Sequence, residues 1–246
     1  MFLKLCKHEF KCTYRMFFIL YAILLLAAYS LASILAAQYG SPYGIQWLVM
    51  YVVAIFATLI GCEILIFRSY YLSMYSNAGY LTNTLPVSER TLFLAKLFVY
   101  SVWTILSGIC VLGSIFLVFT AVPEVTLKPF PMMFWIIMAI SLLLQAIFNT
   151  VLIMTAITAA HTSFIRNHRL FIALIIYFAV DFIRERIASR LPSSAYIANH
   201  PEFVALHDIN SLNQLATPLG IGLLLASIVV LTSLGIYFMK HKMELE

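Results

Sequence analysis

Long apolar segments alternate with short polar ones along the whole chain. A membrane-spanning helix needs roughly 20 consecutive, mostly apolar residues. Six segments meet or approach that length: 16–37, 45–67, 91–120, 132–160, 170–187 and 218–239. The fifth is the weakest of them, because Asp181 interrupts it. The pattern predicts an all-α integral membrane protein with six transmembrane helices.

The N-terminal 15 residues follow a different pattern from the spans. Phe2, Leu3, Cys6, Phe10 and Thr13 fall near one face of a helix, and most of the lysines fall on another. Such a pattern is typical of an amphipathic helix at the membrane surface, so residues 1–15 are predicted to form an interfacial helix. The alternative is that they extend the first span into water.

Composition narrows the class of protein. Hydrophobic residues make up 63% of the chain, charged residues only 10%, and the mean hydropathy is +0.98. These values exclude an ordinary soluble domain. No repeat or low-complexity linker divides the chain, so a single membrane domain, 1–246, is expected. The longest polar stretch, 188–217, is predicted to lie outside the cell and to contain short helices.

The distribution of basic residues predicts the orientation in the membrane. If both termini are cytoplasmic, 11 of the 15 lysines and arginines lie on the cytoplasmic side. The positive-inside rule favours this arrangement. The net charge of +5 then reflects topology and contact with anionic lipid, and it does not indicate nucleic-acid binding.

The polar segment between the second and third spans, 68–90, is predicted to be a structured cytoplasmic element. Its interior, YYLSMYSNAGYLTNTLP, alternates aromatic with small polar residues. Thr84 is a candidate helix cap, and Pro86 suits the first turn of the helix that follows. A membrane subunit needs such an element if a cytoplasmic partner is to push on it.

This segment resembles the cytoplasmic coupling region of type-2 permeases of ABC transporters. The string GYLT-x-TLPVS runs from Gly79 to Ser88, and a lysine, Lys96, follows. The resemblance extends to the basic N-terminal elbow helix, the six spans and the external segment before the last span. It implies a permease of the bacterial plasma membrane, more often an exporter than an importer. The residues that would contact an ATPase are Tyr70, Tyr71, Met74, Tyr75, Asn77, Gly79, Tyr80, Leu81 and Thr82.

The resemblance also implies partners. The chain has no Gly-rich loop of the form G-x-x-x-x-G-K-S/T, so we expect it to be no enzyme and to bind no cofactor itself. ATP and magnesium would be bound by a separate ATPase subunit in two copies. A second permease chain, the same or related, would complete the translocation path as a dimer.

Two charged residues are expected at membrane depth near the cytoplasmic side. Glu63 lies about one turn inside the second span, and Lys96 lies at a comparable depth in the third. Ionisable groups in membranes pair with one another or face wet cavities, so a Glu63–Lys96 ion pair is predicted. A purely structural pair is favoured over a role in coupling or proton transfer.

The fourth span carries a polar stripe. Ser141, Gln145 and Asn149 recur at four-residue intervals and therefore share one helix face. Such a stripe either joins helices by hydrogen bonds or lines a path. Near the end of the fifth span, Asp181 is placed to pair with Arg184.

Histidine and cysteine spacing predicts neither a metal site nor disulfides. The four cysteines are expected to be free thiols. Two other function classes remain: an ion-coupled secondary transporter or channel using Glu63, and an intramembrane enzyme, for which no converging catalytic groups are found. The sequence carries no signal for the cargo, nor for homodimer against heterodimer.

Overall fold

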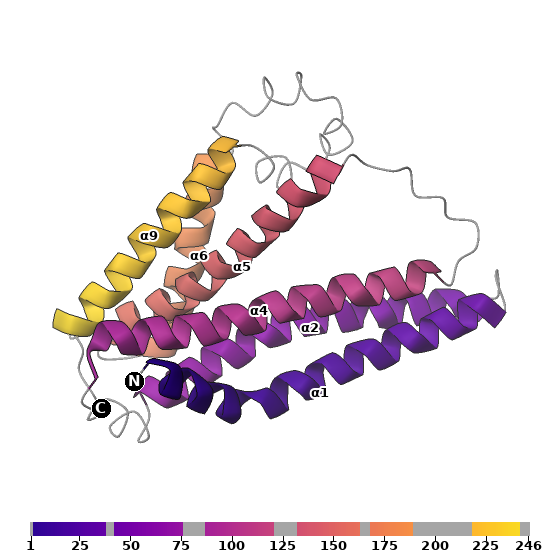
Figure 1. The fold of residues 1–246 in the computed structure, drawn as a ribbon, viewed down its shortest axis with the longest axis horizontal. Helices are drawn as coiled ribbons and strands as arrows, with labels where there is room; N and C mark the ends of the chain where they lie inside the picture. The colour runs from indigo at the N-terminus through magenta and orange to yellow at the C-terminus, as the bar shows by residue number, and fades with distance from the viewer. Residues whose placement is uncertain are drawn as a thin grey trace. The chain divides into compact units, whose positions relative to one another are not determined.

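The computed structural model consists of long α-helices joined by segments that are not described. It describes residues 2–37, 42–75, 87–120, 132–162, 168–188 and 218–241. The helices are α1 (Phe2–Ala37), α2 (Pro42–Tyr75), α4 (Glu89–Thr120), α5 (Met132–Ala160), α6 (Arg169–Ala188) and α9 (Pro218–His241), all drawn in Figure 1. Each of the six predicted spans therefore corresponds to a helix.

Five of these helices are long and apolar enough to cross a membrane: α1, α2, α4, α5 and α9. The exception is α6, where Asp181, Arg184, Glu185 and Arg186 fall within 20 residues. The architecture is that of an all-α, multi-pass membrane protein. Six spans, both termini in the cytoplasm and an interfacial N-terminal helix stay predictions.

The contacts within the chain divide it into two compact units. The first consists of residues 1–73 and 94–127, and the second of residues 74–93 and 128–246. In the first unit, α1, α2 and α4 share a core in which Leu24, Leu31, Tyr51 and Val111 are buried. In the second, α5 packs against both α6 and α9.

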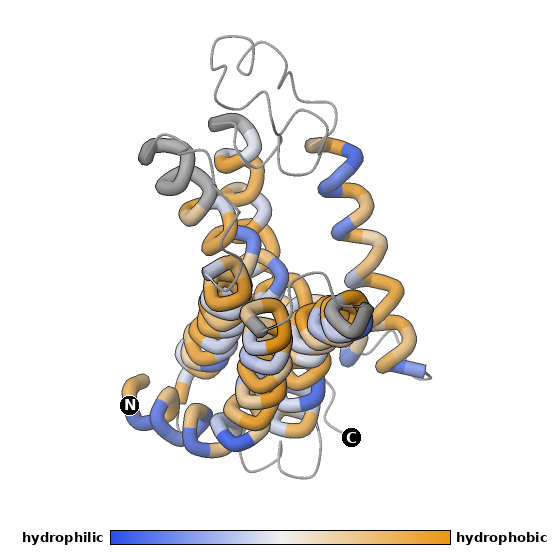
Figure 2. Tube along the Cα trace, turned by 90° about the vertical axis from the view of Figure 1, so that its right-hand side faces the viewer, coloured by the Kyte–Doolittle hydropathy of each residue, from blue (hydrophilic) through white to orange (hydrophobic). Residues whose placement is uncertain are grey.

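The N-terminal residues and the first span form one continuous helix, α1, rather than two elements. The first turns nevertheless run at an angle to the rest (Figures 1 and 2), and Figure 2 shows that the hydrophilic residues of α1 gather in this part. Thr13 lies there and donates a hydrogen bond to the carbonyl of Glu9 at 2.9 Å. A bond of this kind to the preceding turn commonly bends a helix.

The polar segment after the second span begins as helix. α2 continues eight residues beyond the predicted span, so 68–75 belong to it. The next helix begins at Glu89, and Ser88 caps it: the Thr91 N–H lies 3.4 Å from the Ser88 hydroxyl oxygen, and the Leu92 N–H donates to the Ser88 carbonyl. Ser88 therefore caps α4. Thr84 and Pro86 lie outside the described residues, so the roles assigned to them stay predictions.

Candidate functional site

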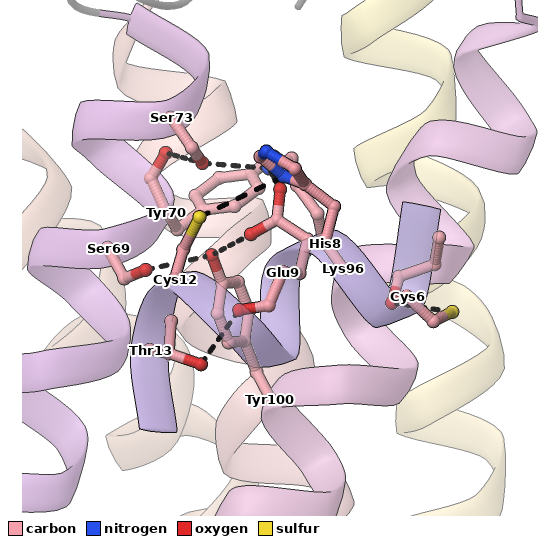
Figure 3. A network of polar contacts seen from close by, with 11 residues as sticks. Cys6, His8, Glu9, Cys12, Thr13, Ser69, Tyr70, Ser73, Lys96 and Tyr100 are labelled. Atoms are coloured by element: carbon pink, nitrogen blue, oxygen red, sulfur yellow. Dashed lines mark hydrogen bonds and ion pairs between the residues drawn. The ribbon is translucent and has the colours of Figure 1, made fainter. Parts of the chain in front are cut away.

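In the first unit, polar side chains from three helices, α1, α2 and α4, form a buried network (Figure 3). Its centre is an ion pair between Glu9 of α1 and Lys96 of α4. The side chain of Lys96 is fully buried, and that of Glu9 is 8% exposed. We call the five residues of this group the Glu9–Lys96 network: Glu9, Ser69, Ser73, Lys96 and Tyr100.

The remaining members, on α2 and α4, form further hydrogen bonds with the charged groups of the ion pair and with one another. Lys96 donates a second hydrogen bond to the Ser73 hydroxyl at 2.9 Å, and the Tyr100 hydroxyl lies 3.5 Å from the other carboxylate oxygen of Glu9. Ser69 and Tyr100 share a hydrogen bond of 3.2 Å. Such additional bonds are needed because a buried ion pair regains its desolvation cost only when its other polar atoms are also satisfied.

An aromatic cluster next to the network holds α1 against α4. The Trp103 ring stacks on Phe17 with 4.7 Å between centroids, and its indole N–H donates to the Thr13 hydroxyl at 2.9 Å. The Tyr21 hydroxyl donates to the Trp103 carbonyl at 3.0 Å. The first five turns of α1 are thereby fixed in register against α4.

The expected ion pair between Glu63 and Lys96 is corrected by the structure. Lys96 reaches Ser73, and ten residues, or about 15 Å of helix, separate Ser73 from Glu63. The carboxylate that meets Lys96 is Glu9. Sequence reasoning missed Glu9, although its spacing from Cys6 and Thr13 places it on the buried face of α1.

The residues predicted to contact an ATPase differ in accessibility. Tyr70 and Met74 are fully buried and Tyr75 is 5% exposed, whereas Tyr71 is partly exposed. Buried side chains pack the chain itself, so only Tyr71 among these four offers surface to a partner. The other predicted contacts lie outside the described residues: Asn77, Gly79, Tyr80, Leu81 and Thr82.

The buried aromatic residues at the end of α2 have intramolecular partners. In the first unit, the Tyr70 ring packs edge-on against Tyr100, with centroids 6.4 Å apart. In the second, the Tyr75 ring stacks on His161 at 4.0 Å. His161 is itself 2% exposed and bonded to the Ile157 carbonyl. Both tyrosines are thus part of the core.

The second unit contains another polar group, which we call the Arg184 cluster: Gln145 and Asn149 of α5 with Asp181 and Arg184 of α6. Arg184 donates to the Asp181 carboxylate at 3.1 Å and to the Gln145 side-chain oxygen at 3.3 Å. The Gln145 amide donates to the Asn149 oxygen at 3.0 Å. The predicted Asp181–Arg184 pair is confirmed.

The polar stripe of α5 is divided by this arrangement. Gln145 and Asn149 are partly exposed and belong to the Arg184 cluster, whereas Ser141 is 1% exposed. Gln145 joins α5 to α6 by a hydrogen bond, which is one of the two uses predicted for the polar stripe. Arg184 was not connected with the stripe, because sequence spacing does not show which faces of α5 and α6 meet.

Within the described residues, no three histidine, cysteine or acidic side chains are grouped so that they could hold a metal ion. The four cysteines are free thiols. No protein-family model, curated protein or solved structure matches the chain.

Proposed function

We propose that the chain is the permease subunit of an ATP-driven ABC transporter, most often an exporter, which pairs with a second permease chain and two copies of a separate ATPase. The observation that carries the proposal is the string from Gly79 to Ser88, with its position between the apolar helices α2 and α4. The proposal does not specify the cargo.

The surroundings of this string support a role in transmitting force. Segment 76–86 connects the end of α2 with the capped start of α4. Ser73 and Lys96 lie close to the two ends of this connection, and they are hydrogen-bonded to each other. Because Glu9 joins the same network, a displacement of the segment would be passed to α1, α2 and α4 together.

The mechanism that follows is a change of helix arrangement driven by the ATPases. When two ATPases close on ATP, each pushes on the segment before Pro86 of one permease chain. The helices on both sides of the segment then tilt, and the path between the two permease chains opens on the other side of the membrane. In this mechanism the chain takes no part in the chemistry of ATP hydrolysis. It forms the translocation path and transmits the movement of the ATPases to the helices.

The test is affinity purification of the tagged full chain from its native membrane, followed by mass spectrometry. We expect a stoichiometric subunit with a Walker loop to co-purify. Tyr80→Asp and Leu81→Asp, changed one at a time, should reduce the recovered ATPase at least about tenfold, since an unpaired charge at an interface costs more than 1.4 kcal/mol.

The matched control is His168→Asp, which adds the same charge in the other predicted cytoplasmic loop. His168 is exposed and has a φ of 55°, a region that Asp tolerates. Its ATPase recovery should equal that of the wild type. Recovery of well-folded protein without any ATPase, together with solute movement driven by an ion gradient, would refute the permease proposal and direct attention to Glu63.

A further inference from the structure

The guanidinium group of Arg184 is held in one orientation from three sides. Its Cζ lies 4.6 Å above the centre of the Phe148 ring, and the ring is fully buried. Asp181 accepts a hydrogen bond from one terminal nitrogen and Gln145 from the other. A planar, pre-oriented guanidinium is the group that proteins use most often to bind phosphate or carboxylate in two-point fashion.

The Arg184 cluster contains more hydrogen-bond donors than its own acceptors can pair with. Arginine carries five N–H donors. Its Nε is buried and has no hydrogen-bond partner in the described part of the chain. Asn149 accepts from Gln145, and no described residue accepts from its own amide nitrogen. Asp181 supplies the single negative charge of the cluster, so its acceptors are too few for the donors of Arg184 and Asn149.

The cluster lies against the apolar stretch of α5 and is open at its edge. The apolar stretch of α5 runs from Ala139 to Ala160, 22 residues, and Asn149 is the eleventh of them. The side chain of Asp181 is 33% exposed and that of Arg184 is 13% exposed. Ionised side chains that pack against a membrane helix usually pair with one another or mark a ligand or ion pathway. Phe178, three residues before Asp181, and Ile187, three residues after Arg184, are 60% and 52% exposed, so the open edge is bordered by apolar surface.

We propose that the Arg184 cluster binds the anionic headgroup, a phosphate or a carboxylate, of an amphiphilic molecule. The headgroup accepts hydrogen bonds from Arg184 and Asn149, and the apolar body lies along Phe178 and Ile187. Asp181 is the counter-ion of Arg184 in the empty site, and the ligand displaces it. The inference rests on the proposed function in one respect: in a permease this molecule is the cargo.

The test measures equilibrium binding of ³²P-labelled decyl phosphate to the full chain in phosphatidylcholine nanodiscs, with empty nanodiscs as background. We expect saturable binding to the wild type. Arg184→Gln should weaken it at least about tenfold, because charge-assisted hydrogen bonds to the anion are lost. Asp181→Asn should strengthen it several-fold, since the competing carboxylate is removed.

The matched control is Arg186→Gln, the same substitution two residues further along α6, where the guanidinium stacks on Phe182 instead. It should leave binding within about twofold of the wild type. If Arg184→Gln fails to fold, Arg184→Lys and Asp181→Asn decide the question. If the cluster only joins α5 to α6, Arg184→Lys and Asp181→Asn should both lower the stability of the protein, and Asp181→Asn should bind no more probe than the wild type. That result would overturn the inference.

Three competitors distinguish the sources of the anion. Unlabelled decyl phosphate should displace the probe, whereas decyl maltoside, which is neutral, should not. Inorganic phosphate that competes as well as decyl phosphate would overturn the amphiphilic part of the inference and leave a soluble anion as ligand.

Failure of this inference is separable from failure of the proposed function. If an ATPase co-purifies but Arg184→Gln binds decyl phosphate as well as the wild type does, the anion site is refuted and the permease proposal stays intact. Arg184-dependent binding by a chain that brings down no ATPase would support the anion site and refute the permease proposal.

Discussion

At Lys96, a cation is fully buried on a helix face that otherwise packs apolar side chains. Phe93, Val99 and Tyr100 are fully buried on the same face of α4. The ammonium group is stable there because Glu9 and Ser73 replace the water that it loses. The sequence showed that Lys96 needs a carboxylate, but two acidic residues of the first unit lie on apolar helices, and only the packing of α1 against α4 selects Glu9.

Removal of Lys96 should therefore destabilise the chain strongly. We expect Lys96→Met to lower the free energy of unfolding by about 3 kcal/mol, since it leaves the Glu9 carboxylate buried without its cation. The double variant Glu9→Gln/Lys96→Met should regain most of that loss. Thermal unfolding in detergent, read out as a double-mutant cycle, measures the coupling.

The control for this cycle is Lys7→Met, which removes an exposed lysine from the same N-terminal part of α1. Its stability should stay within about 0.5 kcal/mol of the wild type. Equal losses in Lys7→Met and Lys96→Met, or additive losses in the double variant, would contradict the role assigned to the ion pair.

At the scale of the elements, the lengths of the helices follow from the sequence, whereas their ends depend on local chemistry. The predicted fourth span and α5 have the same bounds, 132–160, because the segment is mostly apolar and contains no charged residue, glycine or proline. The predicted second span ends at residue 67, where the predicted cytoplasmic element begins, whereas α2 continues without a break to Tyr75. Tyr70 and Met74 extend the buried face of the helix by two turns, and this tertiary packing keeps the segment helical.

A close approach of α9 within the second unit gives a prediction for one glycine. A Cβ added to Gly235 would lie 2.7 Å from Phe93 Cζ and 2.8 Å from Thr155 Cγ2. Helices in membranes use small residues at such contacts. Gly235→Ala should lower the free energy of unfolding by about 1–3 kcal/mol, the usual cost of overpacking. The melting temperature of the purified protein measures it.

Gly222 of the same helix is the matched control, since a Cβ there would meet nothing within 4 Å. Gly222→Ala should be neutral or should stabilise the helix by up to about 1 kcal/mol, because alanine has the higher helix propensity. A Gly235→Ala variant as stable as Gly222→Ala would show that Phe93 and Thr155 move aside without cost.

At the scale of the whole molecule, the hydrophobicity of the surface agrees with a membrane environment. Large apolar side chains are exposed along most helices, among them Phe18 of α1, Phe56 of α2 and Phe116 of α4. In water such a surface would aggregate, whereas lipid covers it without cost. The orientation in the bilayer follows from the basic residues alone and stays a prediction.

Labelling of Cys12 tests that orientation. Cys12 is the exposed cysteine of α1, and the neighbouring Cys6 is buried. If the N-terminus is cytoplasmic, a membrane-impermeant maleimide should label Cys12 only after the cells are permeabilised. Cys12→Ser should abolish this signal. In the same background, Ser193→Cys, in the predicted external segment, should be labelled in intact cells; labelling of Cys12 in intact cells would reverse the topology.

The sequence by itself determined the class of the protein and the position of its helices. Both depend on the number of consecutive apolar residues, which is a local property. It also indicated the Asp181–Arg184 pair, because three residues on a helix bring two side chains together. The tertiary structure decided which carboxylate meets Lys96, that Tyr70 and Met74 are buried, and that Arg184 reaches Gln145. These facts depend on the faces and the register with which separate helices pack, and no single helix encodes either.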